Sequence, residues 1–239
     1  MRLVVVTGVG TGVGKTHATV ALLRAWGRES PVFGYKPIES GVTRAGGVAN
    51  AEPFAGEDEA RLAAASTFHV KQPPLQVRLE APLSPHLAAR REGVVVDVVD
   101  ITRDVGRLRG LSDLVVELPG GLFSPLTASL CNADLVAALL PDVTLLVAPD
   151  RLGVLHDVRA VAEACRARGL RLSGVVLTAP AAADPSTGTN AAEIPLVTGL
   201  DVLASLPRAA EEALSESGGI AGLLGRCRGE AVAREAAPV

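Results

Sequence analysis

The chain has 239 residues, a net charge of −3 and 48% hydrophobic residues. This length suits one domain over residues 1–239, and the charge leaves no electrostatic footprint for nucleic acid or an anionic membrane surface. The three cysteines are widely spaced, which favours reduced, buried thiols in the cytoplasm over disulfides. No apolar run approaches the roughly 18 residues that a membrane-spanning helix needs, and the first residues do not have the pattern of a signal peptide.

Apolar runs alternate along the chain with segments of helical periodicity, which is typical of a parallel sheet covered by helices on both faces. The Val- and Leu-rich runs lack polar alternation, as expected for strands buried on both faces. The predicted strands span 2–7, 32–36, 113–117, 143–148, 173–178 and 202–206, and the predicted helices span 15–27, 57–65, 84–91, 98–108, 130–139, 154–168 and 208–225. The sequence therefore predicts an α/β fold with a mostly parallel central sheet.

Three further segments lack such patterns. Residues 43–56 and 180–192 are rich in turn-forming residues and poor in apolar ones, so we expect two mobile loops there. We expect a disordered tail after about residue 225.

The most informative segment is the glycine-rich run T-G-V-G-T-G-V-G-K-T at residues 7–16. It joins a predicted strand to a predicted helix, and such a loop presents backbone N–H groups to phosphate. In this arrangement Lys15 reaches the outer phosphates, and the Thr16 hydroxyl is the usual Mg²⁺ ligand. The usual G-x-x-x-x-G-K-[ST] pattern has glycine where this chain has Val9. The run still predicts a P-loop that binds a nucleoside triphosphate.

Other candidate residues follow the predicted strands, because parallel α/β sheets bind ligands at the carboxyl ends of their strands. Glu117 ends the strand 113–117, where a carboxylate typically holds Mg²⁺ in P-loop proteins. Asp58 is a second candidate, which the sequence barely separates from Glu57 and Glu59. Lys36 follows a strand and is one of only three lysines among 23 Lys and Arg residues, so it is a candidate active-site residue. A surface acid and a surface lysine are the alternatives for Glu117 and Lys36.

Five segments, in order, resemble the dethiobiotin synthetase family over residues 1 to about 212. They are the P-loop at 8–16, G-Y-K-P-I-E-S-G at 34–41, L-S-P-H at 83–86, V-E followed by G-G at 116–121, and R-L-G at 151–153. The resemblance implies a P-loop NTPase fold and an ATP-dependent ligase that closes a ring on 7,8-diaminononanoate. In that reaction CO₂ forms a carbamate, which becomes a carbamic–phosphoric mixed anhydride before the second amine closes the ureido ring. The resemblance also implies Mg²⁺ as cofactor, ATP as co-substrate and a homodimer.

The resemblance carries functional roles to individual residues. It implies metal binding by Thr16, Asp58 and Glu117, and catalytic roles for Lys15, Lys36, Thr11 and Ser40, with Ser40 also contacting the substrate. It implies nucleotide binding by Gly12, Val13, Gly14, Lys15, Thr16, Asp58, Glu117, Gly120, Thr178, Pro207 and Glu211. It places the substrate carboxylate at a helix start of the second subunit, with Leu152, Gly153, Val154 and His156.

Some residues leave alternatives open. Thr178 stands where many members have an asparagine that reads the adenine edge, so the base preference stays open. Leu118-Pro119 replaces Gly-Ala after Glu117, which together with Thr178 motivates a nucleotide-binding relative with a redirected activity. The main rival is a P-loop switch ATPase of the partitioning or metal-insertase type. Those proteins have a signature lysine at the position of Gly10, which argues against them here.

Overall fold

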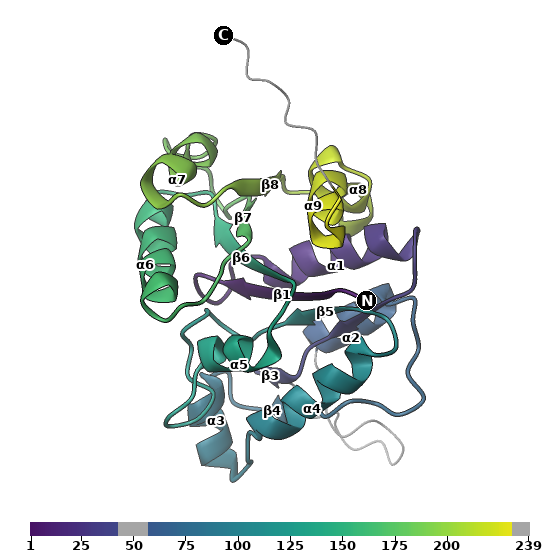
Figure 1. The fold of residues 1–239 in the computed structure, drawn as a ribbon. Coiled ribbons are helices and arrows are strands. Elements are labelled where there is room, and N and C mark those ends of the chain that lie inside the picture. Colours follow the sequence, from purple (N-terminus) through teal and green to yellow (C-terminus); the bar gives the residue numbers. More distant parts are fainter. Residues whose placement is uncertain (43–56, 231–239) are drawn as a thin grey trace.

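Six parallel strands form the central sheet of the computed structural model, which describes residues 1–42 and 57–230 (Figure 1). Their order is β2-β5-β1-β6-β7-β8. The strands are β1 (Leu3–Gly8), β2 (Val32–Tyr35), β5 (Asp113–Glu117), β6 (Val143–Pro149), β7 (Gly174–Thr178) and β8 (Val202–Leu206). Each lies within about a residue of its predicted range, so the predicted α/β fold is confirmed.

Helices cover both faces of this sheet (Figure 1). Along β1, Val4 and Val6 pack into one core cluster, whereas Leu3 and Val5 pack into another. The first face carries α1 (Lys15–Gly27), α2 (Glu57–Ala65), α8 (Glu211–Ser215) and α9 (Gly218–Arg228). The second carries α4 (Val98–Arg109), α5 (Asn132–Leu139), α6 (Val154–Ala167) and α7 (Asn190–Thr198). Helix α3 (Pro85–Glu92) packs on two short strands, at 38–40 and 77–79. The alternation along β1 explains the continuous apolar run, since a strand between two helical layers has no solvent face.

A second, two-stranded parallel sheet was not predicted. It pairs β3 (Ile38–Ser40) with β4 (Val77–Leu79), and Glu39 lies opposite Arg78. Strands of three residues are too short to produce a recognisable period. Strand β3 follows β2 in the chain after only Lys36 and Pro37. The small sheet therefore begins directly after Lys36.

The C-terminal part of the chain differs from the prediction in two places. Two helices, α8 and α9, stand where one helix was predicted over 208–225, because α8 ends at Ser215. Ser217 then caps α9 by accepting a hydrogen bond from the Ile220 N–H (3.3 Å). Helix α9 ends at Arg228, three residues beyond the predicted end of the helix, and the tail predicted after about residue 225 stays a prediction. Residues 231–239 lie outside the described ranges.

One of the two predicted loops is shorter than predicted. Helix α7 begins at Asn190, and the connection before it is tied to the end of β6 by the Asp150 carboxylate. This carboxylate accepts from the Gly188 N–H (2.8 Å) and the Asn190 amide (2.7 Å). Residues 190–192 are therefore part of a helix, while the mobility predicted for residues 180–189 stays a prediction. The loop predicted over 43–56 falls outside the described residues.

Within the described residues no helix is both long and apolar enough to cross a membrane. The three cysteines are free, with Cys165 and Cys227 buried and Cys131 half-buried.

Candidate active site

The strand order brings the predicted site residues to one edge of the sheet. β5 lies between β2 and β1, so the residues that follow these three strands are neighbours in space. Lys36 follows β2, Glu117 ends β5 opposite Val6, and the P-loop follows β1. Three separate parts of the sequence therefore meet where ligands bind in parallel α/β sheets.

The P-loop has the backbone that its glycines predict. Gly12 and Gly14 have φ angles of 70° and 84°, a left-handed conformation that favours glycine. A Cβ on Gly8 would lie 2.8 Å from Val13 Cγ2, so the loop closes tightly enough to exclude a side chain there. Lys15 is buried, and its Nζ donates to the Gly10 carbonyl (2.8 Å). Burial lowers the pKa of Lys15 to about 8, against the opposing charge of Glu117.

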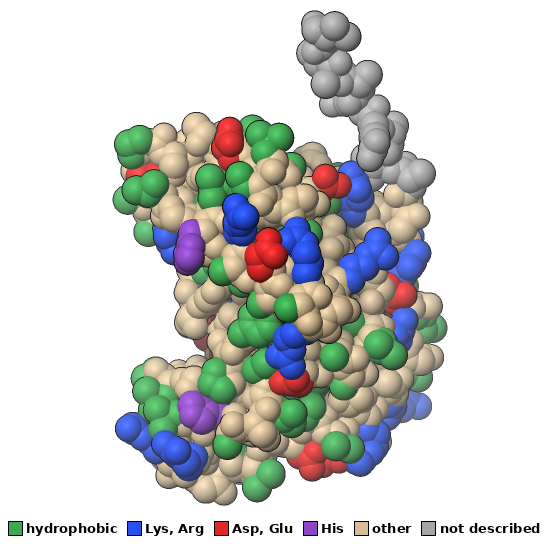
Figure 2. All heavy atoms as spheres, turned by 60° about the vertical axis from the view of Figure 1, so that its left-hand side comes forward, with side chains coloured by type: hydrophobic (Ala, Val, Ile, Leu, Met, Phe, Trp, Pro, Cys, Tyr) green, Lys and Arg blue, Asp and Glu red, His purple; other side chains and the backbone are tan. Residues whose placement is uncertain are grey.

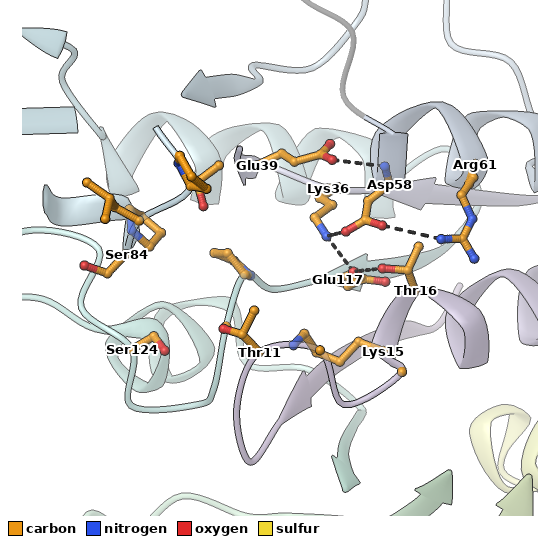
Figure 3. Close-up of a pocket in the computed structure, with 18 of the residues that line it drawn as sticks. Thr11, Lys15, Thr16, Lys36, Glu39, Asp58, Arg61, Ser84, Glu117 and Ser124 are labelled. Atoms are coloured by element: carbon orange, nitrogen blue, oxygen red, sulfur yellow. Dashed lines mark hydrogen bonds and ion pairs between the residues drawn. The ribbon is translucent and has the colours of Figure 1, made fainter. Parts of the chain in front are cut away.

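Lys36 lies at the centre of the site, between two carboxylates (Figure 3). Its Nζ is 2.5 Å from Asp58 Oδ2 and 2.6 Å from Glu117 Oε1. The Thr16 hydroxyl donates to the same Glu117 oxygen (2.8 Å). Burial alone would lower the pKa of Lys36, but the charges of Glu117 and Asp58 and their hydrogen bonds outweigh it and raise that pKa. Burial likewise opposes the charged form of Asp58, and the Lys36 charge and hydrogen bond lower the Asp58 pKa overall.

The oxygens around Lys36 fit a magnesium ion. Thr16, Asp58 and Glu117 present one hydroxyl and two carboxylates, the hard ligands that Mg²⁺ prefers. Glu117 is fully buried, and its Oε2 has no hydrogen-bond partner among the described residues. A buried, unpartnered carboxylate oxygen is costly unless a cation or donor satisfies it. The described part of the chain contains no group of three or more His, Cys, Asp and Glu side chains arranged to hold a metal, and this set has two such side chains, Asp58 and Glu117.

Two cavities meet at the P-loop. The first, of about 730 Å³, is lined by most of the predicted phosphate and metal residues, namely Thr11, Gly12, Gly14, Lys15, Thr16, Lys36, Ser40, Asp58, Glu117 and Gly120. The second, of about 710 Å³, is lined by Val13, Thr178 and Pro207, and it shares Thr11, Gly12, Gly14 and His17 with the first. The space-filling view shows a hollow in the surface between the part that holds α6 and α7 and the part that holds α3 (Figure 2).

Thr178 supports the P-loop from the second cavity. Its hydroxyl donates to the Val13 carbonyl (2.8 Å), and a Cβ on Gly14 would lie 3.0 Å from its methyl group. The side chain is buried, and its one O–H donor is already used on the P-loop backbone. Thr178 ends β7, and its side chain contacts the P-loop backbone. Its predicted contact with the nucleotide stays a prediction.

Glu211 lies beside the site without lining either cavity. Its carboxylate pairs with the Arg61 guanidinium and lies 3.6 Å from His17 Nδ1. Arg61 also lies 3.6 Å from Asp58 Oδ1, so this ion-pair chain joins α8 to α2 across the start of α1. The sequence analysis missed Arg61, whose only signal is its position one helical turn after Asp58.

The predicted carboxylate-binding residues line neither cavity, although the preceding residue, Arg151, lines the second. Leu152, Gly153, Val154 and His156 form the start of α6. Leu152 is 73% exposed, and its N–H donates to the Asp184 carboxylate (2.8 Å). Within one chain, this segment does not join the site around Lys36.

The loop after Glu117 is held by a buried amide that the sequence analysis missed. Asn132 Nδ2 donates to the carbonyls of Pro119 (2.6 Å) and Gly121 (2.8 Å). Leu118 is fully buried, and a Cβ on Gly120 would lie 2.6 Å from Ser124 Oγ, close to Thr11. With Leu118-Pro119 in this loop, Gly120 and Gly121 still lie against the P-loop.

A parallel sheet whose first strand passes through a glycine-rich loop into a helix that starts with Lys15-Thr16 defines a P-loop NTPase. A family model described as an AAA domain matches residues 2–213. An ATP-dependent dethiobiotin synthetase of Anaeromyxobacter dehalogenans strain 2CP-1 is 39% identical over 216 residues, spanning 87% of this chain and 90% of the relative. One from Caulobacter sp. strain K31 is 38% identical and spans 74% of this chain and 76% of the relative. The chain belongs to the dethiobiotin synthetase family of P-loop NTPases.

Solved structures with a similar backbone are more distant in sequence. The MinC:MinD cell division complex of Aquifex aeolicus gives a TM-score of 0.58 at 13% identity, covering 99% of both chains. A ParA family ATPase of Chlorobium tepidum gives 0.54 at 13% identity, covering 96% of this chain and 93% of that one. At such low identity these likenesses show the fold alone.

Proposed function

We propose that the protein is a cytoplasmic, ATP-dependent dethiobiotin synthetase, a ligase that forms C–N bonds between 7,8-diaminononanoate and CO₂. The observation that carries this proposal is the position of the Lys36 ammonium, held between the buried Glu117 and the half-buried Asp58 at the edge of the P-loop cavity. Family membership supports the same activity. A phosphate-binding loop with a buried lysine beside it suits a reaction in which an anionic nucleophile meets the γ-phosphate.

The P-loop binds the triphosphate through its backbone N–H groups and Lys15. Thr16, Asp58 and Glu117 hold Mg²⁺, which when bound neutralises charge on the β- and γ-phosphates. Lys36 Nζ contacts Asp58 and Glu117, and the Thr16 hydroxyl donates to the same Glu117 oxygen, which supports their assignment as one ligand set. Lys36 is then the internal cation that balances Asp58 and Glu117 before the nucleotide binds.

The reaction proceeds through two displacements. One amine of the substrate takes up CO₂ as a carbamate, whose oxygen attacks the γ-phosphorus and releases ADP. The second amine attacks the carbamoyl carbon, closes the ureido ring and releases phosphate. Lys15 and Lys36 offset the repulsion between the carbamate and the phosphate, and Thr11 and Ser40 orient both groups from the walls of the first cavity.

The second cavity receives the base and ribose, next to Val13, Thr178 and Pro207. The substrate carboxylate binds at the start of α6 of a second subunit, with Leu152, Gly153, Val154 and His156, where N–H groups and the helix dipole favour an anion. We therefore propose a homodimer with sites at its interface. Leu152 is exposed and lines neither cavity of its own chain, which supports a role in a neighbouring subunit's site.

The proposal is tested by phosphate release from Mg-ATP with diaminononanoate and bicarbonate added in turn. A ligase releases phosphate quickly only when both are present. A switch ATPase, the rival that the sequence analysis weighed, releases phosphate regardless of both.

A further inference from the structure

Glu39 caps the helix that carries Asp58. Its two carboxylate oxygens accept hydrogen bonds from the backbone N–H groups of Asp58 (3.0 Å) and Glu59 (3.1 Å). Helix α2 begins at Glu57, so these are N–H groups of the first turn, which have no partner within a helix. Glu39 is only 9% exposed, and burial raises its pKa, but the two N–H donors stabilise its charged form (Figure 3).

The same turn of α2 has a second anchor on the small sheet. Arg78 donates to both oxygens of the Glu59 carboxylate at 2.6 Å, from Nε and Nη2. Glu39 and Arg78 lie opposite each other in the β3–β4 pair. Two neighbouring side chains of this sheet thus hold the start of α2, one by its backbone and the other by its side chain.

The segment that carries Glu39 also carries Lys36. Lys36 contacts the side chain of Asp58 at 2.5 Å, while Glu39 binds the backbone N–H of the same residue. Asp58 is therefore fixed at two points by one short stretch of chain. In contrast, Glu57 is exposed and Glu59 points to Arg78, so of these three acids it is Asp58 that faces the P-loop.

We propose that Glu39 is a positioning residue that, with the β3–β4 sheet, holds Asp58 in the geometry for metal binding. This inference rests on the proposed magnesium site. The family pattern K-P-x-x-S-G leaves position 39 unspecified, so the resemblance gives Glu39 no role. Residues that orient a metal ligand typically change metal affinity by 10- to 100-fold when they are removed.

The chain offers a matched control. The Glu92 carboxylate also accepts from two consecutive backbone N–H groups, those of Glu80 (3.1 Å) and Ala81 (2.9 Å). Glu92 lines neither of the two cavities at the P-loop. Its removal deletes hydrogen bonds of the same kind without touching Asp58.

The test uses Mn²⁺ as the probe, with free Mn²⁺ followed by electron paramagnetic resonance in the presence of a non-hydrolysable ATP analogue. For E39A we expect a Mn²⁺ dissociation constant raised by about tenfold or more. E39Q keeps one acceptor oxygen at nearly the same size, so we expect a smaller rise of about threefold. For E92A we expect the wild-type value within about twofold, because surface changes away from a site have little effect.

Each outcome bears on the proposal. Mn²⁺ binding by E39A within twofold of the wild type overturns it, and so do equal losses in E39A and E39Q, which indicate an effect of charge alone. An equal loss in E92A also overturns it, since the effect is then general destabilisation. If E39A does not fold, unchanged Mn²⁺ affinity in E39Q overturns it. If the wild type itself binds no Mn²⁺ with the nucleotide analogue, it is the proposed function that fails.

Discussion

Lys36 Nζ lies 2.6 Å from Glu117 Oε1, at side chains that are 5% and 0% exposed. The residue proposed to stabilise the reacting phosphate is thus paired with a residue proposed to hold the metal. Positions 36 and 117 meet because β2 and β5 are neighbours in the sheet. A buried pair of this kind contributes little net stability, but each member makes the other's burial tolerable.

The first prediction concerns this coupling. Glu117→Gln leaves Lys36 with one carboxylate, and Lys36→Met leaves Glu117 as a buried charge without its cation. We expect Lys36→Met to lower the free energy of unfolding by about 3 kcal/mol. We expect Glu117→Gln to lower it by less, because Lys36 keeps its contact with Asp58. The double substitution is expected to cost clearly less than the sum, because neither charge is then left alone. Urea unfolding of the four proteins at pH 7 measures this, and additive losses would show that the two residues are not coupled.

A second prediction addresses the role of Lys36 in turnover. We expect Lys36→Ala to lower kcat by more than about tenfold, which corresponds to more than ~1.4 kcal/mol of activation free energy. Lys71→Ala is the matched control, since Lys71 is exposed and lines neither cavity at the P-loop. Steady-state phosphate release with all substrates present measures both variants. Turnover of Lys36→Ala within tenfold of the wild type contradicts a role at the reacting phosphate.

The third prediction concerns Thr178, whose hydroxyl donates to the Val13 carbonyl of the P-loop. Thr178→Val keeps the shape but removes this hydrogen bond, so we expect a stability loss of about 1–2 kcal/mol and weaker ATP binding. Thr198→Val is the control. Thr198 is also buried, but it donates to the Ile194 carbonyl of its own helix, α7. Calorimetric titration with ATP is expected to separate the two, and equal affinity in both variants would remove Thr178 from the support of the loop.

The cysteines provide a prediction about pH. Burial raises the pKa of Cys165 to about 11 and of Cys227 to about 12. At pH 8 both stay almost wholly as thiols, which react poorly, so we expect iodoacetamide to modify only the half-buried Cys131 in the native protein. Intact-mass spectrometry counts the adducts, and two or three adducts on the folded protein would contradict this.

The raised pKa values of Cys165 and Cys227 also predict whether stability rises or falls with pH. The unfolded chain releases these thiol protons near pH 9, whereas the folded protein keeps them until pH 11 or 12. Above pH 9 the folded state therefore binds more protons than the unfolded state, and these two groups make stability fall as the pH rises. Substitution of both cysteines by alanine is expected to flatten this part of the pH profile.

Much of the fold was predictable because most of its strands and helices have clear hydrophobic patterns in the sequence. The six strands of the main sheet are apolar runs buried on both faces, and their parallel direction was predicted from the helices between them. β3 and β4 were missed because each has three residues, and α7 was missed because Pro195 and the polar residues before it imitate a loop.

The site was predictable where its residues follow strands or belong to the P-loop, as do Lys15, Thr16, Lys36 and Glu117. Asp58 was separable from Glu57 and Glu59 only in three dimensions, since all three open the same helix. Glu39 and Asn132 act through the backbone of distant residues, at 3.0 Å from Asp58 N and 2.6 Å from the Pro119 carbonyl. No sequence pattern encodes such contacts between segments.

The central claim is that the loop at residues 7–16 and the residues around Lys36 form a ligase site. Phosphate release from Mg-ATP by the wild-type protein tests it most directly. The account predicts little release with ATP alone or with either diaminononanoate or bicarbonate, and rapid release with both, matched by formation of an equal amount of dethiobiotin. Release at the same rate with and without these two substrates would contradict it.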